Sequence, residues 1–201
     1  METFYLEVRC SDKAPQTHYL LSKLFNRIHG IYRVMGRSLG VSFPELTLPS
    51  EKFPRVATPG SVLRVFGSSE DLTSLINNSG LIAMIDSGEI HALPICRVPD
   101  TATRVAYVRV HPKQFSQAEF LRRQRRRARR GNPPLEQLNS QRKDCRLPYL
   151  LVIKDSDLGR LQIPIYIEKV IVDNTESNGG GFNYYGLGNS KDGRITTVFD
   201  F

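Results

Sequence analysis

The first group of residues with a clear chemical capacity is a dense run of arginines. Seven of the nine residues from 122 to 130 are arginine: Arg122, Arg123, Arg125, Arg126, Arg127, Arg129 and Arg130. The whole chain has 28 basic and 20 acidic residues, a net charge of +8, so this run accounts for nearly all of the imbalance. Clustered guanidinium groups attract polyphosphates and release their counterions. The run predicts a nucleic-acid-binding element; the alternative is a nuclear-localisation or non-specific basic patch.

The second candidate for chemistry is a histidine. The chain has four histidines, and His29 lies beside Ile28 and four residues after Phe25, at the margin of a predicted apolar helix face. Histidine exchanges protons near neutral pH. The alternative is a packed or solvent-facing histidine without a chemical role.

RNA could be the substrate of such a histidine, because RNA carries its own nucleophile. A 2′-hydroxyl can attack the adjacent phosphorus when the protein orients the strand, moves the protons and stabilises the phosphate charge. The sequence has no Asp/Glu cluster typical of a two-metal nuclease. We therefore expect any RNA cleavage to be independent of metal and of other cofactors.

The arginines are predicted to lie on a helix over residues 117–130. Ser116 and Glu119 have capping-box spacing, and Gly131 stands where a left-handed C-terminal cap belongs. Pro133 and Pro134 stop continuation of the helix. Caps at both ends favour a positioned recognition helix over an unstructured tail.

His29 is predicted to lie on a helix over residues 15–35, because apolar residues recur there with helical periodicity. Strands are predicted at 4–9, 40–44, 61–66 and 89–97, with a second helix over 70–78 that Ser68 or Ser69 caps. The order strand–helix–strand–strand–helix–strand matches a ferredoxin-like unit.

The second half of the chain is more basic. Strands are predicted at 104–110, 150–154 and 162–172, the last two joined as an antiparallel pair by a turn at 155–159. We expect an α+β protein with an N-terminal ferredoxin-like domain, residues 1–97, followed by a basic α+β RNA-binding domain, residues 98–201, that carries the arginine-rich helix.

The spacing of the cysteines and the hydropathy of the chain bear on where in the cell the protein is expected. Cys10, Cys96 and Cys145 are odd in number and widely spaced, which argues against a disulfide framework or a zinc site. The N-terminus does not resemble a signal peptide, and no apolar run reaches the roughly 20 residues that span a bilayer. We expect a soluble, cytoplasmic protein with no membrane partner.

Several segments together resemble the CRISPR type I-F repeat-processing endoribonuclease family. The resemblance rests on segments that occur in the family's order and cover most of the chain: Leu24–His29, Leu39–Pro44, the arginine helix at Phe120–Arg130, Leu147–Tyr149 with a following strand and Ser156, and Gly180–Leu187.

The resemblance implies an activity and partners. It implies cleavage of the repeat hairpin in precursor CRISPR RNA at the 3′ base of the stem, without metal, and retention of the mature guide within the surveillance complex. His29 then matches the catalytic histidine, and Tyr185 matches the tyrosine that orients it.

The chain departs from the family's pattern at several positions. Lys154 stands at the first and Ser156 at the second position of a serine-x-serine pair whose first serine constrains the attacking ribose. Either residue could serve the site: a shift in the turn would let Ser156 hold the ribose, while Lys154 stabilises the phosphate. Tyr107 and Arg109 align with a base-reading arginine and glutamine, and Leu161 aligns with a stacking phenylalanine.

Two rival functions remain at this stage. The first is a hairpin-binding family member that cuts slowly or not at all, since the first serine is missing. The second is an unrelated structural RNA-binding protein with an arginine-rich helix.

Overall fold

The computed structural model describes residues 3–11, 17–49, 57–110, 117–131, 147–156, 159–172, 181–188, 190–191 and 194–201. The chain divides into two compact units. The first unit comprises Met1–Val110 and Arg146–Phe201, and the second comprises His111–Cys145. The predicted division near residue 98 falls within the first unit, and it stays a prediction.

The first sheet of the first unit is antiparallel throughout. It contains β1 (Phe4–Cys10), β2 (Gly40–Ser42), β3 (Val62–Gly67) and β4 (Ile90–Ala92) in the order β2-β3-β1-β4, and β5 (Cys96–Arg97) also pairs with β1. The α+β class is confirmed, whereas the ferredoxin-like assignment stays a prediction.

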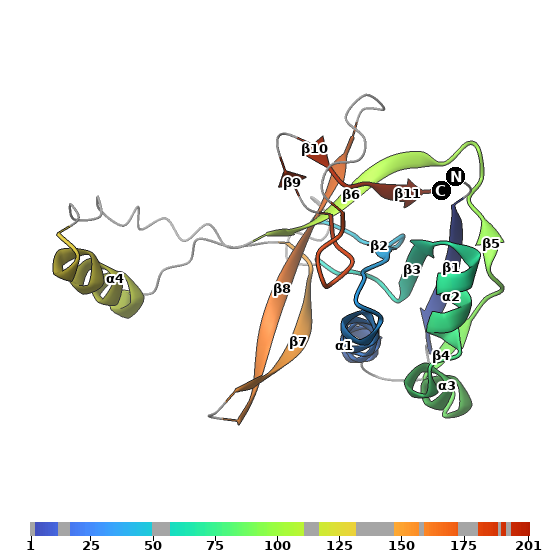
Figure 1. Ribbon diagram of the computed structural model, residues 1–201, viewed down its shortest axis with the longest axis horizontal. Helices are drawn as coiled ribbons and strands as arrows, with labels where there is room; N and C mark the ends of the chain where they lie inside the picture. The colour runs from blue at the N-terminus through green and yellow to red at the C-terminus, as the bar shows by residue number, and fades with distance from the viewer. Residues whose placement is uncertain are drawn as a thin grey trace. The chain divides into compact units, whose positions relative to one another are not determined.

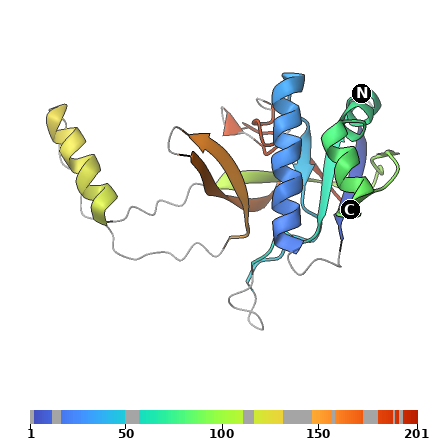
Figure 2. The same cartoon turned by 90° about the horizontal axis from the view of Figure 1, so that it is seen from below.

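Helices α1 (Thr17–Met35), α2 (Ser69–Ile76) and α3 (Ser79–Asp86) pack with this sheet. The predicted apolar positions of α1 are buried as expected, from Leu20 to Tyr32. Ser68 caps α2 by accepting a hydrogen bond from the Asp71 backbone N–H at 3.1 Å, which confirms the predicted cap. Figures 1 and 2 show α1 between α2 and α3 on one side and the β7–β8 hairpin on the other.

The second sheet of the first unit has the order β11-β6-β8-β7 and is also antiparallel. Its strands are β6 (Thr103–Val110), β7 (Tyr149–Ser156), β8 (Gly159–Ile171) and β11 (Val198–Asp200). The long strand β8 pairs with β7 over residues 159–166 and with β6 over residues 166–171. The predicted antiparallel pair is therefore confirmed. A further two-stranded sheet joins β9 (Ser190–Lys191) to β10 (Arg194–Ile195).

The acidic residue Glu7 of β1 is buried and paired with two arginines. Glu7 is 4% exposed and accepts hydrogen bonds from Arg9 and Arg64, each 2.7 Å long. Burial opposes ionisation of this carboxyl, but the two guanidinium groups outweigh it and hold the pKa of Glu7 below its ordinary value. The charge is therefore retained inside the sheet because it is paired.

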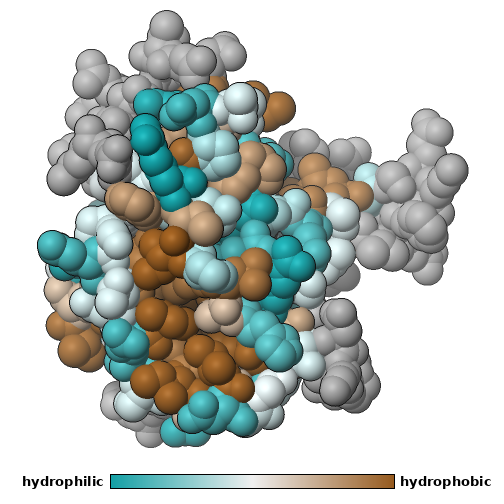
Figure 3. All heavy atoms as spheres, turned by 90° about the vertical axis from the view of Figure 1, so that its right-hand side faces the viewer, coloured by the Kyte–Doolittle hydropathy of each residue, from teal (hydrophilic) through white to brown (hydrophobic). Residues whose placement is uncertain are grey.

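Several large apolar side chains remain at the surface of the first unit. They include Ile82, Leu93 and Phe201, each at least 40% exposed. Figure 3 shows apolar side chains gathered on one face of the molecule. No helix in the described part of the chain is long and apolar enough to cross a membrane.

The described helix of the second unit is α4 (Gln117–Arg129), which agrees with the predicted 117–130. Gly131 has φ +67° and its N–H donates to the Ala128 carbonyl at 3.1 Å, so the left-handed C-terminal cap is confirmed. The N-terminal cap predicted at Ser116 lies outside the described residues.

The sequence interpretation was wrong about the number of elements around residues 78–97. Helix α3 was not predicted; the Asn78 side chain caps it by accepting from the Gly80 N–H at 3.0 Å. The strand predicted at 89–97 is two short strands, β4 and β5, that pair with different ends of β1.

Candidate active site

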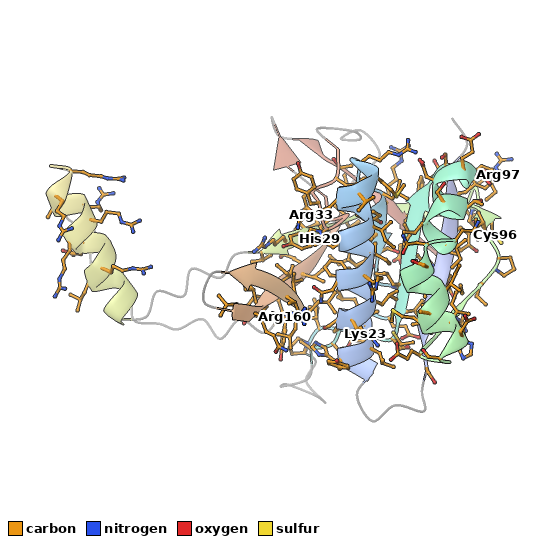
Figure 4. The ribbon with its side chains drawn as sticks, turned by 60° about the horizontal axis from the view of Figure 1, so that its bottom comes forward. Lys23, His29, Arg33, Cys96, Arg97 and Arg160 are labelled. Atoms are coloured by element: carbon orange, nitrogen blue, oxygen red, sulfur yellow. The ribbon has the colours of Figure 1, made fainter. Side chains whose placement is uncertain are left out.

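The candidate site is built around His29, which lies on the face of α1 next to the turn at residues 183–187. His29 is half-buried, and its Nδ1 lies 2.6 Å from the carbonyl oxygen of Tyr184. A carbonyl oxygen can only accept, so Nδ1 is the protonated nitrogen. The neutral ring therefore keeps an unprotonated Nε2, which can accept a proton. Figure 4 labels His29 on α1 together with Lys23 and Arg33.

Tyr185 holds the imidazole by stacking. Its ring lies 4.3 Å from the His29 ring, centroid to centroid, at an interplanar angle of 23°. The tyrosine ring also stacks with Phe25, with ring centroids 5.9 Å apart and planes only 9° from parallel. His29 and Phe25 are one helical turn apart on α1, so both side chains lie on the helix face that meets Tyr185.

A tight turn places Tyr184 and Tyr185 against α1. The Asn183 side-chain oxygen accepts from the backbone N–H of Tyr185 at 2.9 Å and of Leu187 at 3.2 Å. Gly186 has φ +75°, a conformation that side chains disfavour, and a Cβ there would lie 2.5 Å from the Leu39 carbonyl oxygen. Glycine is therefore required where this turn meets the strand β2.

The turn is also tied to both sheets. The Val41 N–H of β2 donates to the Gly186 carbonyl at 2.9 Å, and the Gly188 N–H donates to the Tyr107 carbonyl of β6 at 2.8 Å. The oxygen that fixes His29 thus belongs to a segment anchored on two sides.

Arg109 lies beside Tyr185, whereas the Tyr107 side chain lies in the core. The Arg109 guanidinium carbon lies 5.6 Å from the Tyr185 ring centroid. Tyr107 is 1% exposed, and its hydroxyl donates to the Phe43 carbonyl at 3.0 Å. Burial, followed by the Asp200 carboxylate, raises the pKa of the Tyr107 hydroxyl well above its ordinary value. The side chain packs in the core, where it cannot reach an RNA base.

The backbone of Lys154 and Ser156 lies in the last part of β7, where Lys154 pairs with Leu161 and Ser156 pairs with Gly159. The side chains of Lys154 and Ser156 lie outside the described residues. Leu161 is 49% exposed on β8. The roles predicted for these three residues stay predictions.

The described arginines of α4 are half-buried or exposed, and the Arg123 side chain lies outside the described residues. The exposed ones are Arg122, Arg125, Arg126 and Arg129, and Arg130, which follows the helix, is exposed as well. Arg127 is half-buried and has an interaction partner. The helix presents cations to solvent along its length, as the sequence predicts.

The described residues contain neither a metal-binding cluster nor an activated Cys10 thiol. No three His, Cys, Asp or Glu side chains in that part of the chain are grouped to hold a metal ion. Cys10 is buried, and burial raises the pKa of its thiol to about 12, so it is no ready nucleophile. Metal independence stays a prediction.

The polar contacts between α1 and β7 were missed by the sequence interpretation. Asn26 donates to the Leu151 carbonyl at 2.7 Å and accepts from the Ile153 N–H at 2.9 Å. A hollow of about 440 Å³ opens beside these contacts, lined in part by Arg27, Gly30 and Gln162. The signal in the sequence was a polar residue at every fourth position, His18, Ser22 and Asn26, beside the apolar face of the helix.

Comparisons with known proteins give one clear result. A family model described as "CRISPR-associated protein (Cas_Csy4)" matches residues 5–201. No curated protein matches the sequence. A solved structure described as "Structure A of CRISPR endoribonuclease Cse3 bound to 19 nt RNA" is 14% identical, covers 98% of this chain and 100% of its own, and has a TM-score of 0.31.

Proposed function

Because the chain belongs to the CRISPR-associated Cas_Csy4 family, the type I-F repeat-processing endoribonucleases, we propose that it cuts precursor CRISPR RNA at the 3′ base of the repeat hairpin. The observation that carries the proposal is the orientation of His29, whose Nδ1–H is held by the Tyr184 carbonyl at 2.6 Å. This leaves Nε2 available to the substrate.

The proposed reaction is a transesterification within the RNA strand. The 2′ oxygen forms a bond to the adjacent phosphorus, and the bond from that phosphorus to the 5′ oxygen breaks. Nε2 of His29 accepts the proton of the 2′-hydroxyl, and the departing 5′ oxygen takes a proton from solvent. The products are a 2′,3′-cyclic phosphate and a 5′-hydroxyl. Because the nucleophile is part of the RNA, the step itself requires no metal.

The remaining residues have supporting roles in the proposal. Tyr185 keeps the imidazole plane fixed, and the guanidinium of Arg109 lies close enough to this pair to meet the phosphate or a guanine edge. Lys154 and Ser156, at the end of β7, hold the phosphate and the ribose, and Leu161 packs against the end of the stem.

The arginines of α4 grip the stem through its phosphates. Side chains cannot read the deep, narrow groove of a continuous A-form helix, but a short hairpin opens that groove at its ends. Such contacts fix the position of the stem more than they select its sequence. The enzyme then retains the mature guide and associates with the other subunits of the surveillance complex.

One experiment tests the proposed chemistry. Purified protein is incubated with labelled repeat hairpin RNA in excess chelator, and the product ends are determined by mass. We expect a single cut leaving a cyclic phosphate, and we expect a 2′-deoxy nucleotide at the scissile position to abolish cutting while binding is unchanged. Cleavage of the deoxy substrate, or loss of activity in chelator, contradicts the mechanism.

A second candidate function is favoured by one residue. Lys154 occupies the position of the family's first serine, so the chain could bind the hairpin without cutting it at a useful rate. Tight hairpin binding with no cleavage by the unmodified protein would support this alternative.

A further inference from the structure

The face of α1 toward β7 carries a regular series of polar side chains. His18, Ser22 and Asn26 follow each other at four-residue intervals, so they lie on one side of the helix. Each meets the backbone of β7. His18 Nε2 lies 2.6 Å from the Tyr149 carbonyl, and the Leu151 N–H donates to Ser22 Oγ at 3.1 Å.

Asn26 completes the series with all of its amide atoms engaged. Its Nδ2 donates to the Leu151 carbonyl and to the Ser22 carbonyl, both at 2.7 Å, and its Oδ1 accepts from the Ile153 N–H at 2.9 Å. Both amide donors and the oxygen are therefore used, which fixes the orientation of the side chain.

The spacing of these contacts has a simple geometric basis. Four helical residues rise about 6.0 Å, and two antiparallel strand residues rise about 6.8 Å. Side chains every fourth residue of α1 can therefore meet every second residue of β7. In this pairing α1 takes the place of a neighbouring strand, and it satisfies backbone groups at the open edge of the sheet.

The same geometry connects β7 to His29. Continuing the spacing from Asn26 and Ile153 brings Gly30 level with Asp155. His29 precedes Gly30, and Asp155 lies between Lys154 and Ser156. The contacts of Ser22 and Asn26 therefore determine which residues at the end of β7 stand level with the imidazole.

A change in the register between α1 and β7 would require a large displacement of the strand. The backbone N–H and C=O groups of successive strand residues point in opposite directions. Those of Leu151 and Ile153 face α1, so the backbone groups of Val152, which face the other way, cannot replace them. The next equivalent arrangement is displaced by two residues, roughly 6.8 Å. A partial loosening is also damaging, because a shift of about 1 Å in a reacting group can lower a rate roughly 100-fold.

We propose that Ser22 and Asn26 are positioning residues, which hold the end of the β7–β8 hairpin in register with His29 for the cleavage step. This inference rests on the proposed function. It concerns neither contact with RNA nor proton transfer, because Ser22 is buried and the amide group of Asn26 is fully engaged within the protein.

The test compares four variants in single-turnover cleavage of the repeat hairpin and in binding of its 2′-deoxy form. We expect N26A to lower the cleavage rate at least tenfold at every pH, with binding changed less than threefold. N26D keeps an acceptor for the Ile153 N–H and should retain an intermediate rate. S22A removes one contact and should cause a smaller loss. V34A, a change of an 89% exposed residue on the same helix, should leave the rate unchanged.

A structural measurement accompanies the kinetics. Hydrogen exchange at the Ile153 amide should be at least tenfold faster in N26A, while the amides that pair β7 with β8 stay protected. If N26A does not fold, N26D and S22A decide the matter by the same measurements. If the unmodified protein cuts and N26D and S22A cut equally fast, the inference is overturned. If the unmodified protein does not cut, the proposed function fails first, and the inference fails with it.

Discussion

The two helices that carry the candidate functional side chains, α1 and α4, are held in place in different ways. Helix α1 buries most of one face, from Leu20 to Tyr32. A second face of α1 forms hydrogen bonds with the backbone of the edge strand β7. Most described side chains of α4 are exposed, including Leu121 at 47%. Proton transfer needs atoms fixed within a fraction of an ångström, whereas phosphate attraction tolerates adjustment. The difference suggests a division between cutting, on α1, and gripping, on α4.

The largest expected effect separates the cleavage rate from the affinity for the hairpin. His29→Ala should lower the cleavage rate about 1,000-fold, because it removes the group that accepts the proton, and should change hairpin affinity less than threefold. His91→Ala, at an exposed histidine of β4, is the matched control and should be silent. A large loss of affinity in His29→Ala would show that the two roles overlap on α1.

The next prediction tests whether the turn at residues 183–187, which contacts α1, depends on close packing at Gly186. Gly186→Ala combines a left-handed backbone with a distance of only 2.5 Å between the added Cβ and the Leu39 carbonyl oxygen. We expect it to lower the free energy of unfolding by about 3 kcal/mol. Gly88 has a similar φ of +70° and open space around it, so Gly88→Ala should cost about 1 kcal/mol. Equal losses in chemical denaturation would mean that the close approach is unimportant.

A third prediction concerns α4. Replacing Arg122 and Arg126 together by alanine should weaken hairpin binding about 30-fold at low salt and make the log–log salt slope shallower by about 2. The cleavage rate at saturating protein should change little. Leu121→Ala, on the same helix, leaves the charge intact and should have neither effect. An unchanged slope would remove α4 from the RNA interface.

The smallest effect refines the role of Tyr185. If the tyrosine acts through its ring, Tyr185→Phe should keep the cleavage rate within about threefold, while Tyr185→Leu should lower it about tenfold. Melting temperatures of the two variants provide the control for folding. A strong loss in Tyr185→Phe would instead assign the chemical role to the hydroxyl.

The sequence predicted those parts of the fold that depend on local patterns. The apolar periodicity of α1 and the glycine cap at Gly131 both agree with the structure. The strands that pair only with distant partners were harder. Strand β11 has three residues, and its pairing with β6 depends on contacts nearly 100 residues away in sequence, such as Val198 with Val105. Such short strands carry no periodic signal of their own.

The candidate site was predicted unevenly for the same reason. The motif containing Tyr185 indicated its position beside His29, and the stacking of the two rings agrees with it. The burial of Tyr107 was not foreseen, because alternation along β6 gave no indication which face would meet Phe43. Nor could the partners of Asn26 be foreseen, since they are backbone groups that any sequence in β7 would provide.

The second unit is inserted in sequence between two strands of the first unit, and this has a consequence for its replacement. Val110, the last residue before it, and Tyr149, just after it, both pair with Tyr166 from opposite sides of β8. Two adjacent strand spacings separate them by roughly 10 Å, a gap that a few residues can bridge. The second unit is thus an insertion whose flanking residues, Val110 and Tyr149, lie close together in the second sheet. Replacing residues 111–145 with a short glycine-rich bridge should therefore leave a first unit that still folds.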